Sequence, residues 1–413
     1  MLKMTLRLGL FLCLALAAFG QQTKLLVVSI DGMDYRYLRD ADKLGLKIPT
    51  LRRLMNEGAV ADGVLGIVPT LTWPTHTTML TGLPAERHGI LTNDQPGQPG
   101  QRWWWTKFLT ARTLWQAAHE KKLKTAAIFW PVTTDADIDF RIPEFWEQRR
   151  GHDTPLPPIE KYITPGLIDR ISRAYPSMPV YIFGDRPAMI AARYLLETEK
   201  PDLTLLHVSD LDGEQHETGA FSRHAKAMLE YQDELLGWML QKLPPQTVLA
   251  VVSDHGFETQ AQVYRPKVAL KEAGLRPDAE VAEGLIGVNT EQAAGFFRKA
   301  IGGGVLAREV PIDEVHRMAP HLKAWTAAFE TVRDTIPNGA AEGPAVENGN
   351  GSGLHGLWPT RNDYRASFLL WGPGVRKRRL PQISMQDEGP TFAEIMKVSL
   401  PDVQGHSLWS QVH

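Results

Sequence analysis

The sequence predicts an α/β protein with a mostly parallel central sheet and helices on both faces. The first observation is a set of five apolar runs of strand length, at 24–30, 125–130, 203–209, 247–253 and 366–372. Their apolar residues are continuous, as in strands of a parallel sheet that is covered on both sides. The second observation is a set of helical patterns between these runs, at 111–122, 188–199 and 224–243. Such alternation of strands and helices is typical of the α/β class.

The region 257–352 interrupts this alternation. It ends in the sequence NGAAEGPAVENGNGSG, whose glycines and asparagines are typical of a flexible connector. We therefore expect one catalytic domain over 21–413, with 257–352 inserted in it as a cap subdomain. The stretch 95–165 carries no motif that indicates a function.

The first twenty residues differ from the rest of the chain. Lys3 and Arg7 precede the apolar run LGLFLCLALAAF, which ends in small residues. This order is typical of a secretory signal, and the run is too short for a comfortable transmembrane span. We expect a signal peptide over 1–20 and a secreted or periplasmic mature protein without a stable membrane anchor. An uncleaved anchor is the alternative.

Cysteine content and charge narrow the classes of function. Cys13 is the only cysteine, so signal cleavage leaves no thiol for a disulfide, a nucleophile or a metal site. Any metal must therefore be bound by oxygen and nitrogen. The 413 residues carry a net charge of -2, which argues against binding to duplex nucleic acid through a broad basic field.

Aspartates follow three of the predicted strands. They are Asp31, the pair Asp210 and Asp212, and Asp254. In open parallel sheets, ligands bind outside the carboxyl ends of the strands, and carboxylates crowded there repel one another unless a cation neutralises them. A single aspartate at a strand end is usually a cap or turn residue. Three such ends in one chain indicate a metal site.

Histidines supply further candidate ligands. His216 follows Asp212 by four residues, and His255 follows Asp254 directly. His355 has glycines close to it on both sides in GSGLHGLW. Carboxylate and imidazole ligands suit zinc, with manganese or iron as alternatives. Three other histidines are expected to be structural, namely His76, His88 and His207. His207 in particular lies inside an apolar strand, where a core histidine with satisfied hydrogen bonds is expected.

Taken together, the motifs resemble the nucleotide pyrophosphatase/phosphodiesterase family of the alkaline phosphatase superfamily. The resemblance runs from about residue 24 to the end. Its motifs, in order, are IDG at 30–32, T-x-P-x-H at 72–76, PAERHGILTN at 84–93, D-x-x-x-H at 212–216, SDHG at 253–256 and GLHG at 353–356. The resemblance implies an alkaline-phosphatase-like fold and a hydrolase that acts on phosphodiester or pyrophosphate bonds of a small molecule or nucleotide.

The resemblance also implies a site with two zinc ions per chain. One ion would be bound by Asp212, His216 and His355. The other would be bound by the ligands Asp31, Asp254, His255 and Thr72. Thr72 would be the nucleophile and would form a covalent threonyl-phosphoryl intermediate.

Thr72 lies in PTLTWPTHTTMLTG (69–82), which holds six threonines. A threonine hydroxyl is a poor nucleophile at neutral pH, but a bound dication lowers its pKa and orients it. Pro74 fits the first turn of a helix, whose N-terminus favours a phosphate. The alternative is that Thr72 only caps this helix.

Two further residues are candidates for substrate binding. Relatives usually carry asparagine where this chain has Thr75, and that amide donates to a phosphoryl oxygen. The Thr75 hydroxyl could donate in the same way over a shorter reach, so this departure puts phosphate positioning in doubt. Asn93 matches the family pattern near the pocket, or it forms a turn.

Other functions remain open at this stage. A sulfatase needs a modified cysteine or serine with an arginine four residues later, where this chain has Thr72 and His76. A phosphomonoesterase usually needs a positive side chain, and no arginine is near Thr72 in sequence, although a distant one could fold close to it. A surface binding protein that has lost its chemistry is the non-enzymatic alternative. Trp73 and 103–105 either stack on an organic group of the substrate or pack in the core.

Overall fold

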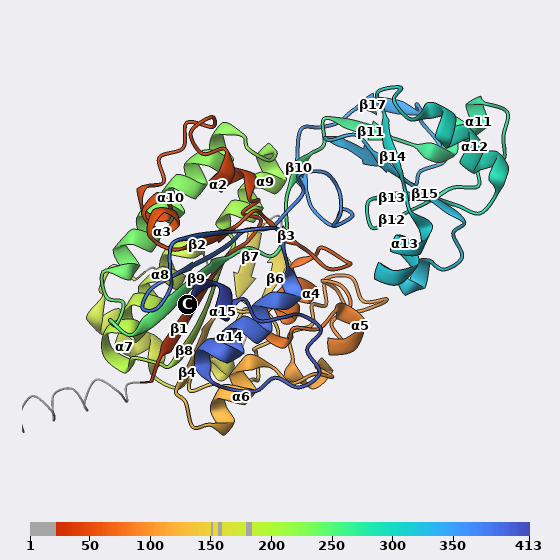
Figure 1. The fold of residues 1–413 in the computed structure, drawn as a ribbon. Helices are drawn as coiled ribbons and strands as arrows, with labels where there is room; N and C mark the ends of the chain where they lie inside the picture. Colours follow the sequence, from red (N-terminus) through yellow and green to blue (C-terminus); the bar gives the residue numbers. More distant parts are fainter. Residues whose placement is uncertain (1–21, 150–151, 156–158, 179–183) are drawn as a thin grey trace, which may run out of the picture.

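The computed structural model describes residues 22–149, 152–155, 159–178 and 184–413. An eight-stranded sheet forms the centre of the main body, in the order β20-β2-β19-β9-β1-β8-β4-β5 (Figure 1). Its strands are β1 (Lys24–Ile30), β2 (Ala59–Ala61), β4 (Thr125–Ile128), β5 (Phe140–Ile142), β8 (Leu203–Val208), β9 (Thr247–Val252), β19 (Phe368–Trp371) and β20 (Arg378–Leu380). All five predicted strands lie in this sheet.

The sheet is mixed rather than wholly parallel. Strand β1 pairs in parallel with β8 and β9, and β4 pairs in parallel with β8 and β5. Strand β19, however, runs antiparallel to both β9 and β2. The apolar run at 366–372 predicted burial, which is observed, but such a run carries no information about strand direction.

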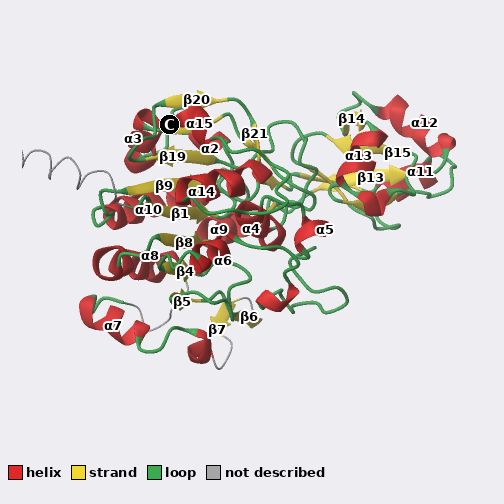
Figure 2. Cartoon of the chain, turned by 60° about the horizontal axis from the view of Figure 1, so that its bottom comes forward, coloured by secondary structure: helices red, strands yellow, loops and turns green. Residues whose placement is uncertain are grey.

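Helices cover both faces of the sheet, as Figure 2 shows. On one face lie α3 (Pro49–Glu57), α7 (Leu167–Ala174), α8 (Asp185–Tyr194) and α10 (Arg223–Leu240). On the other face lie α4 (Thr72–Thr81), α6 (Leu114–Glu120), α14 (Glu388–Met396) and α15 (Trp409–Val412). Strand β1 sends alternate side chains into the two cores, Leu26 and Val28 into the first and Leu25 and Val27 into the second. The three predicted helices are therefore observed as α6, α8 and α10.

Residues between β10 (Glu258–Thr259) and β18 (Gly353–Leu354) form a lobe beside the main body (Figure 1). One sheet of the lobe contains β11 (Gln262–Tyr264), β16 (Thr335–Pro337) and β17 (Val346–Asn348). The other contains β12 (Glu280–Ala282), β13 (Leu285–Val288), β14 (Leu306–Val310) and β15 (Ala327–Thr331). Its helices are α11 (Pro266–Glu272), α12 (Glu291–Ala300) and α13 (Ile312–Met318). The predicted connector thus includes strand β17, which pairs with β11.

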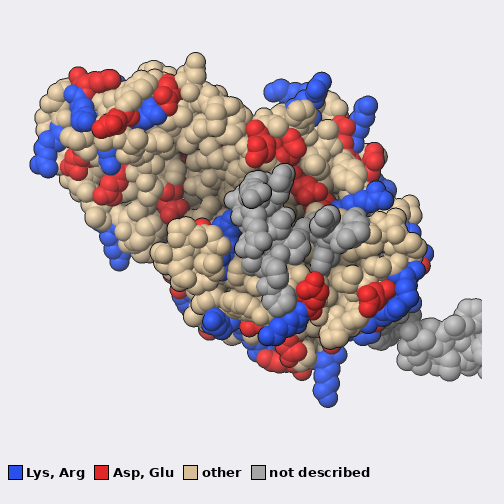
Figure 3. All heavy atoms as spheres, turned by 180° about the vertical axis from the view of Figure 1, so that it is seen from behind, with Lys and Arg blue, Asp and Glu red and all other residues tan. Residues whose placement is uncertain are grey.

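Two further expectations concern the surroundings of the protein. The predicted signal peptide at 1–20 lies outside the described residues. Among the helices that the structure describes, none is both long and apolar enough to span a membrane. On the face in Figure 3, basic and acidic side chains are interspersed rather than gathered into one basic field.

Candidate active site and metal centre

The candidate ligands converge because their strands are neighbours. Strands β9, β1 and β8 lie side by side and parallel, so their carboxyl ends meet at one edge of the sheet. Asp31 directly follows β1, and Asp254 follows β9 after one residue. Helix α9 (Asp210–Thr218) begins just after β8 and carries Asp212 and His216. His355 directly follows β18 at the base of the lobe.

The structure groups the six predicted carboxylate and histidine ligands into two clusters. Within each cluster the ligand atoms lie within 4.8 Å of one another. The clusters are Asp212, His216 and His355, and Asp31, Asp254 and His255. They adjoin, because the rings of His255 and His355 stack with their centroids 3.7 Å apart. They contain the carboxylate and histidine members of the two sets that the family resemblance implies, and Thr72 is the remaining implied ligand.

The atoms that face one another in these clusters fit bound cations. Asp31 Oδ1, Asp212 Oδ1, Asp254 Oδ2 and His255 Nε2 are buried, and within the described structure they have no hydrogen-bond partner outside the clusters. Inside the clusters, His255 Nε2 lies 3.0 Å from Asp254 Oδ2 and 3.3 Å from Asp31 Oδ1. Buried polar atoms without partners are costly, so a group of them at one place indicates a missing ligand. Carboxylate oxygens and imidazole nitrogens are ligands that zinc accepts.

The electrostatics of the clusters favour a positive ion. Burial and the neighbouring carboxylates of Asp254 and Asp212 raise the pKa of Asp31 well above its usual value. Burial works against protonation of His255, yet the adjacent carboxylates, Asp254 foremost, raise its pKa to about 9. The carboxylates thus favour a positive charge at His255 Nε2, and a dication bound there would take the place of the proton.

Backbone carbonyls orient the three histidines. Each Nδ1 atom lies 3.0 to 3.2 Å from a carbonyl oxygen, so a hydrogen bond there leaves Nε2 directed toward the carboxylates. The pairs are His216 with Gly353, His255 with Gly256, and His355 with Thr70. The fold therefore leaves Nε2 of each ring as the atom that is available to a metal.

Thr72 is the first residue of α4, after an N-cap residue, Leu71, with extended backbone. No side-chain hydrogen bond caps this helix, so the structure gives no support to Thr72 as a capping residue. His76 Nδ1 lies 2.8 Å from the Thr72 carbonyl oxygen and 3.7 Å from Asp254 Oδ2. The first turn of α4 therefore lies beside the cluster that contains Asp254.

The two candidate substrate contacts differ in how their polar atoms are used. The Trp73 N–H donates to Asn93 Oδ1 at 3.0 Å, which places the Asn93 amide at the N-terminus of α4. The Thr75 hydroxyl donates to the carbonyl oxygens of Leu71 and Thr72, at 2.6 and 3.1 Å. The hydroxyl of Thr75 is thus engaged within its own helix.

The tryptophans near Thr72 pack in the core. Trp73, Trp103 and Trp104 are all buried. The rings of Trp73 and Trp104 pack edge to face, with their centroids 5.6 Å apart. The Arg102 guanidinium lies over the Trp73 ring, 5.1 Å from its centroid. Core packing is therefore observed for Trp73, Trp103 and Trp104, whereas Trp105 is partly buried against the same core.

Sequence reasoning missed two residues that contact the site. His207 was expected to be a satisfied core histidine, and it is buried and hydrogen-bonded, but its partner is Asp31 (Nε2 to Oδ2, 2.9 Å). Gln215 Nε2 donates to the Gly32 carbonyl oxygen at 3.0 Å, which ties α9 to the segment after Asp31. No local signal in the sequence could have found this contact of His207, because it depends on the register that pairs His207 of β8 with Ser29 of β1.

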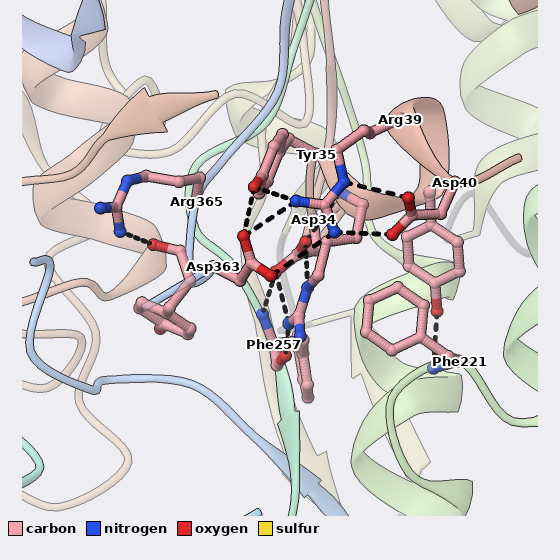
Figure 4. Close-up of polar contacts among 12 residues, drawn as sticks. Asp34, Tyr35, Arg39, Asp40, Phe221, Phe257, Asp363 and Arg365 are labelled. Atoms are coloured by element: carbon pink, nitrogen blue, oxygen red, sulfur yellow. Dashed lines mark hydrogen bonds and ion pairs between the residues drawn. The ribbon is translucent and has the colours of Figure 1, made fainter. Parts of the chain in front are cut away.

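A polar network further holds the segments that follow Asp31 and His255 (Figure 4). Asp34 accepts hydrogen bonds from Arg36 Nε at 2.8 Å and from the Phe257 N–H at 3.2 Å. Arg36 in turn donates to the Phe257 carbonyl oxygen at 2.7 Å. Asp363 accepts from the Tyr35 hydroxyl at 2.6 Å. The two ligand-bearing loops are therefore braced against each other.

Comparison with known proteins agrees with this geometry. The sequence model of the family described as type I phosphodiesterase/nucleotide pyrophosphatase matches residues 25–335. Because this match covers more than half of the chain, the protein belongs to that family.

Individual relatives are distant. A venom phosphodiesterase of Naja atra is 24% identical over 255 residues, which is 57% of this chain and 26% of the relative. Ectonucleotide pyrophosphatase/phosphodiesterase family member 1 of Mus musculus is 24% identical over 246 residues, 56% of this chain and 24% of the relative. The matched part thus spans about a quarter of these relatives.

Solved structures confirm the fold. Murine ectonucleotide pyrophosphatase/phosphodiesterase 5, an inactive variant in complex with AMP, matches with a TM-score of 0.61 at 18% identity, covering 95% of this chain and 100% of the other. The human counterpart matches with a TM-score of 0.61 at 20% identity, covering 94% and 100%. The alkaline-phosphatase-like fold predicted from the sequence is therefore confirmed.

Proposed function

We propose that the protein is a secreted, two-metal phosphodiesterase/nucleotide pyrophosphatase that acts on small phosphodiester or pyrophosphate substrates. The observation that carries this proposal is the pair of adjoining clusters of carboxylate and imidazole ligand atoms, one buried and one half-buried, beside the first turn of α4. Family membership supports the same class of reaction. Secretion is inferred from the signal-like segment at 1–20.

Asp212, His216 and His355 would hold one zinc ion, and the other cluster, joined by Thr72, would hold the second. Bound divalent cations lower the pKa of a nearby hydroxyl and neutralise charge that develops on phosphoryl and leaving oxygens. Zinc is favoured by the ligand types, and manganese or iron remain alternatives.

The residues of the chain then divide the reaction into two displacements. The Thr72 hydroxyl loses its proton, and Oγ1 attacks phosphorus while the bond from phosphorus to the leaving oxygen breaks and that oxygen takes up a proton. Water next attacks the phosphothreonine, which releases the second product and restores the hydroxyl. The N-terminus of α4 favours negative charge at the phosphoryl group in both steps.

Asn93 is the better candidate for a phosphoryl contact. Its Oδ1 atom accepts from Trp73, so its Nδ2 atom is left to donate near the start of α4. Thr75 has its hydroxyl engaged by two backbone carbonyls, so we expect a minor role for it. We also propose the lobe within 257–352 as the cap subdomain of this site.

The charge near Thr72 favours a diester over a monoester. Arg102 lies over the ring of Trp73, the residue after Thr72, and its guanidinium pairs with Asp94 at 2.8 Å. A monoester dianion needs more positive charge from the protein than a diester does. The charge of Arg102 is already neutralised by Asp94. We therefore place the phosphomonoesterase second.

Two measurements on the purified protein test the proposal. Elemental analysis should find about two metal ions per chain, and Asp254→Ala should lower both metal content and turnover. A hydrolysis panel should rank a nucleotide diester, a dinucleotide polyphosphate and a lysophospholipid above an aryl monoester. Full turnover after metal removal would contradict the mechanism, and a protein without tightly bound metal would favour the binding-protein alternative.

A further inference from the structure

His207 lies directly behind the candidate metal ligand Asp31. It is in strand β8, and its side chain is 2% exposed. Its Nε2 atom lies 2.9 Å from Asp31 Oδ2. Its Nδ1 atom lies 3.0 Å from the Phe129 carbonyl oxygen and 3.3 Å from Glu144 Oε2. Both ring nitrogens therefore face acceptors, one of them on a residue of the metal cluster.

This contact divides the two oxygens of Asp31 between different roles. Oδ2 is used by His207, whereas Oδ1 makes no hydrogen bond and lies 3.3 Å from His255 Nε2 inside the cluster. Rotation of the carboxylate about its Cβ–Cγ bond would break the contact with His207 and leave a buried charged oxygen without a partner. Such a loss is costly, so the orientation with Oδ1 toward the cluster is held in place.

We propose that His207 is a positioning residue that fixes Asp31 as a ligand through one oxygen, and that Phe129 and Glu144 in turn hold the ring of His207. The inference rests on the proposed metal centre. It assigns a role in that centre to Glu144, which lies in a stretch without any recognisable motif.

The surroundings of His207 allow little movement of its ring. Phe129 follows β4 with a φ of 54°, a conformation that is unusual for a residue other than glycine, and its carbonyl is the one that meets His207. On the other side, the ring of His76 lies with its centroid 4.4 Å from that of His207. The ring is thus held by polar contacts at both nitrogens and by packing against a neighbouring ring.

His88 provides a matched control, because it is a buried histidine of α5 (Ala85–His88) with hydrogen bonds of its own. Its Nε2 atom lies 3.1 Å from the Thr78 hydroxyl, and its Nδ1 atom accepts from the Ile90 N–H at 3.2 Å. None of the hydrogen bonds that it makes with other described residues reaches either metal cluster. Loss of His88 should therefore affect stability in a similar way without affecting metal binding.

The test measures zinc affinity by competition with a chromophoric chelator, in the full-length mature protein. In His207→Leu, one of the two zinc ions should bind about 10- to 100-fold more weakly, and the other should bind as in the wild type. In His207→Gln, the amide can still donate to Asp31, so the loss should be smaller. Glu144→Gln should weaken the same ion, and His88→Leu should weaken neither.

The outcomes separate this inference from the proposed function. If the wild type binds two zinc ions and His207→Leu binds both as tightly as His88→Leu does at similar thermal stability, the role of His207 is refuted and the metal centre stands. If the wild type binds no zinc, the metal centre is refuted and the inference falls with it. Should His207→Leu fail to fold, wild-type affinity for both ions in His207→Gln and in Glu144→Gln refutes the role of His207.

Discussion

Replacing Thr72 with alanine separates its chemical role from its structural one. The structural cost should be small, because α4 has no side-chain cap and Leu71 is its N-cap residue. The side chain is 6% exposed, so its removal loses one buried methyl group and a hydroxyl, about 1 kcal/mol. If Thr72 is the nucleophile, kcat/KM should fall by at least about 1,000-fold, which corresponds to about 4 kcal/mol of transition-state stabilisation.

Thr77 is the matched control for this experiment. It lies in the same helix, is 3% exposed, and donates its hydroxyl to the Trp73 carbonyl oxygen at 2.9 Å. Thr77→Ala should lower the free energy of unfolding by a similar amount and leave turnover nearly unchanged. Thr72→Ser should keep measurable activity, because the hydroxyl survives.

The assay is hydrolysis of an aryl phosphodiester at matched metal content, with the free energy of unfolding measured in parallel. Metal content should hold in Thr72→Ala because three side chains remain in that cluster. Similar turnover of Thr72→Ala and Thr77→Ala would show that the Thr72 hydroxyl is not the nucleophile.

Three further predictions concern the phosphoryl contact, the metals and a buried acid. Asn93→Ala should lower kcat by about 100-fold, whereas Thr75→Val should keep it within about threefold, since only Asn93 has a free donor in our assignment; the reverse order in steady-state kinetics would overturn that assignment. Removal of metal by a chelator should abolish turnover and lower Tm in calorimetry, because the clustered carboxylates then repel one another, and zinc should restore both; an unchanged Tm would argue against a buried site. Burial and the neighbouring Asp210 carboxylate raise the pKa of Asp185 from 3.8 to about 7, so between these values the folded state holds a proton that the unfolded state has released. The free energy of unfolding should therefore fall as pH rises from about 4 to 7. Asp185→Asn should reduce this slope in denaturant titrations, because asparagine does not titrate. The new amide can donate to Gln232 Oε1, which makes no hydrogen bond within the described structure, after a flip of the Gln232 side chain. An unchanged slope would exclude Asp185 as its source.

Much of the fold was predictable from local patterns. Continuous apolar runs located five of the eight strands of the central sheet, since a strand buried on both faces is apolar at most positions. The short strands β2, β5 and β20 of the same sheet were not predicted. The antiparallel direction of β19 was not predictable, because an apolar run is the same in both directions. The strands of the lobe were also missed, since strands of two to five residues carry too little periodicity to be recognised.

The sequence by itself determined the candidate ligands. Asp31, Asp212 and Asp254 each follow a buried strand closely, and parallel strands bring such ends together whatever the rest of the chain does. Their motifs also carried the family resemblance, which the family match over 25–335 confirms.

Only the tertiary structure decided how these residues are supported. It showed that the Thr75 hydroxyl donates to a backbone carbonyl at the start of its own helix. It also showed that Asn93, from a separate loop, contacts the start of that helix. It also placed His207 of β8 and Glu144, which follows β5, behind Asp31 at the end of β1. These contacts join segments far apart in the chain, so they depend on strand order and register, which no local pattern of side chains encodes.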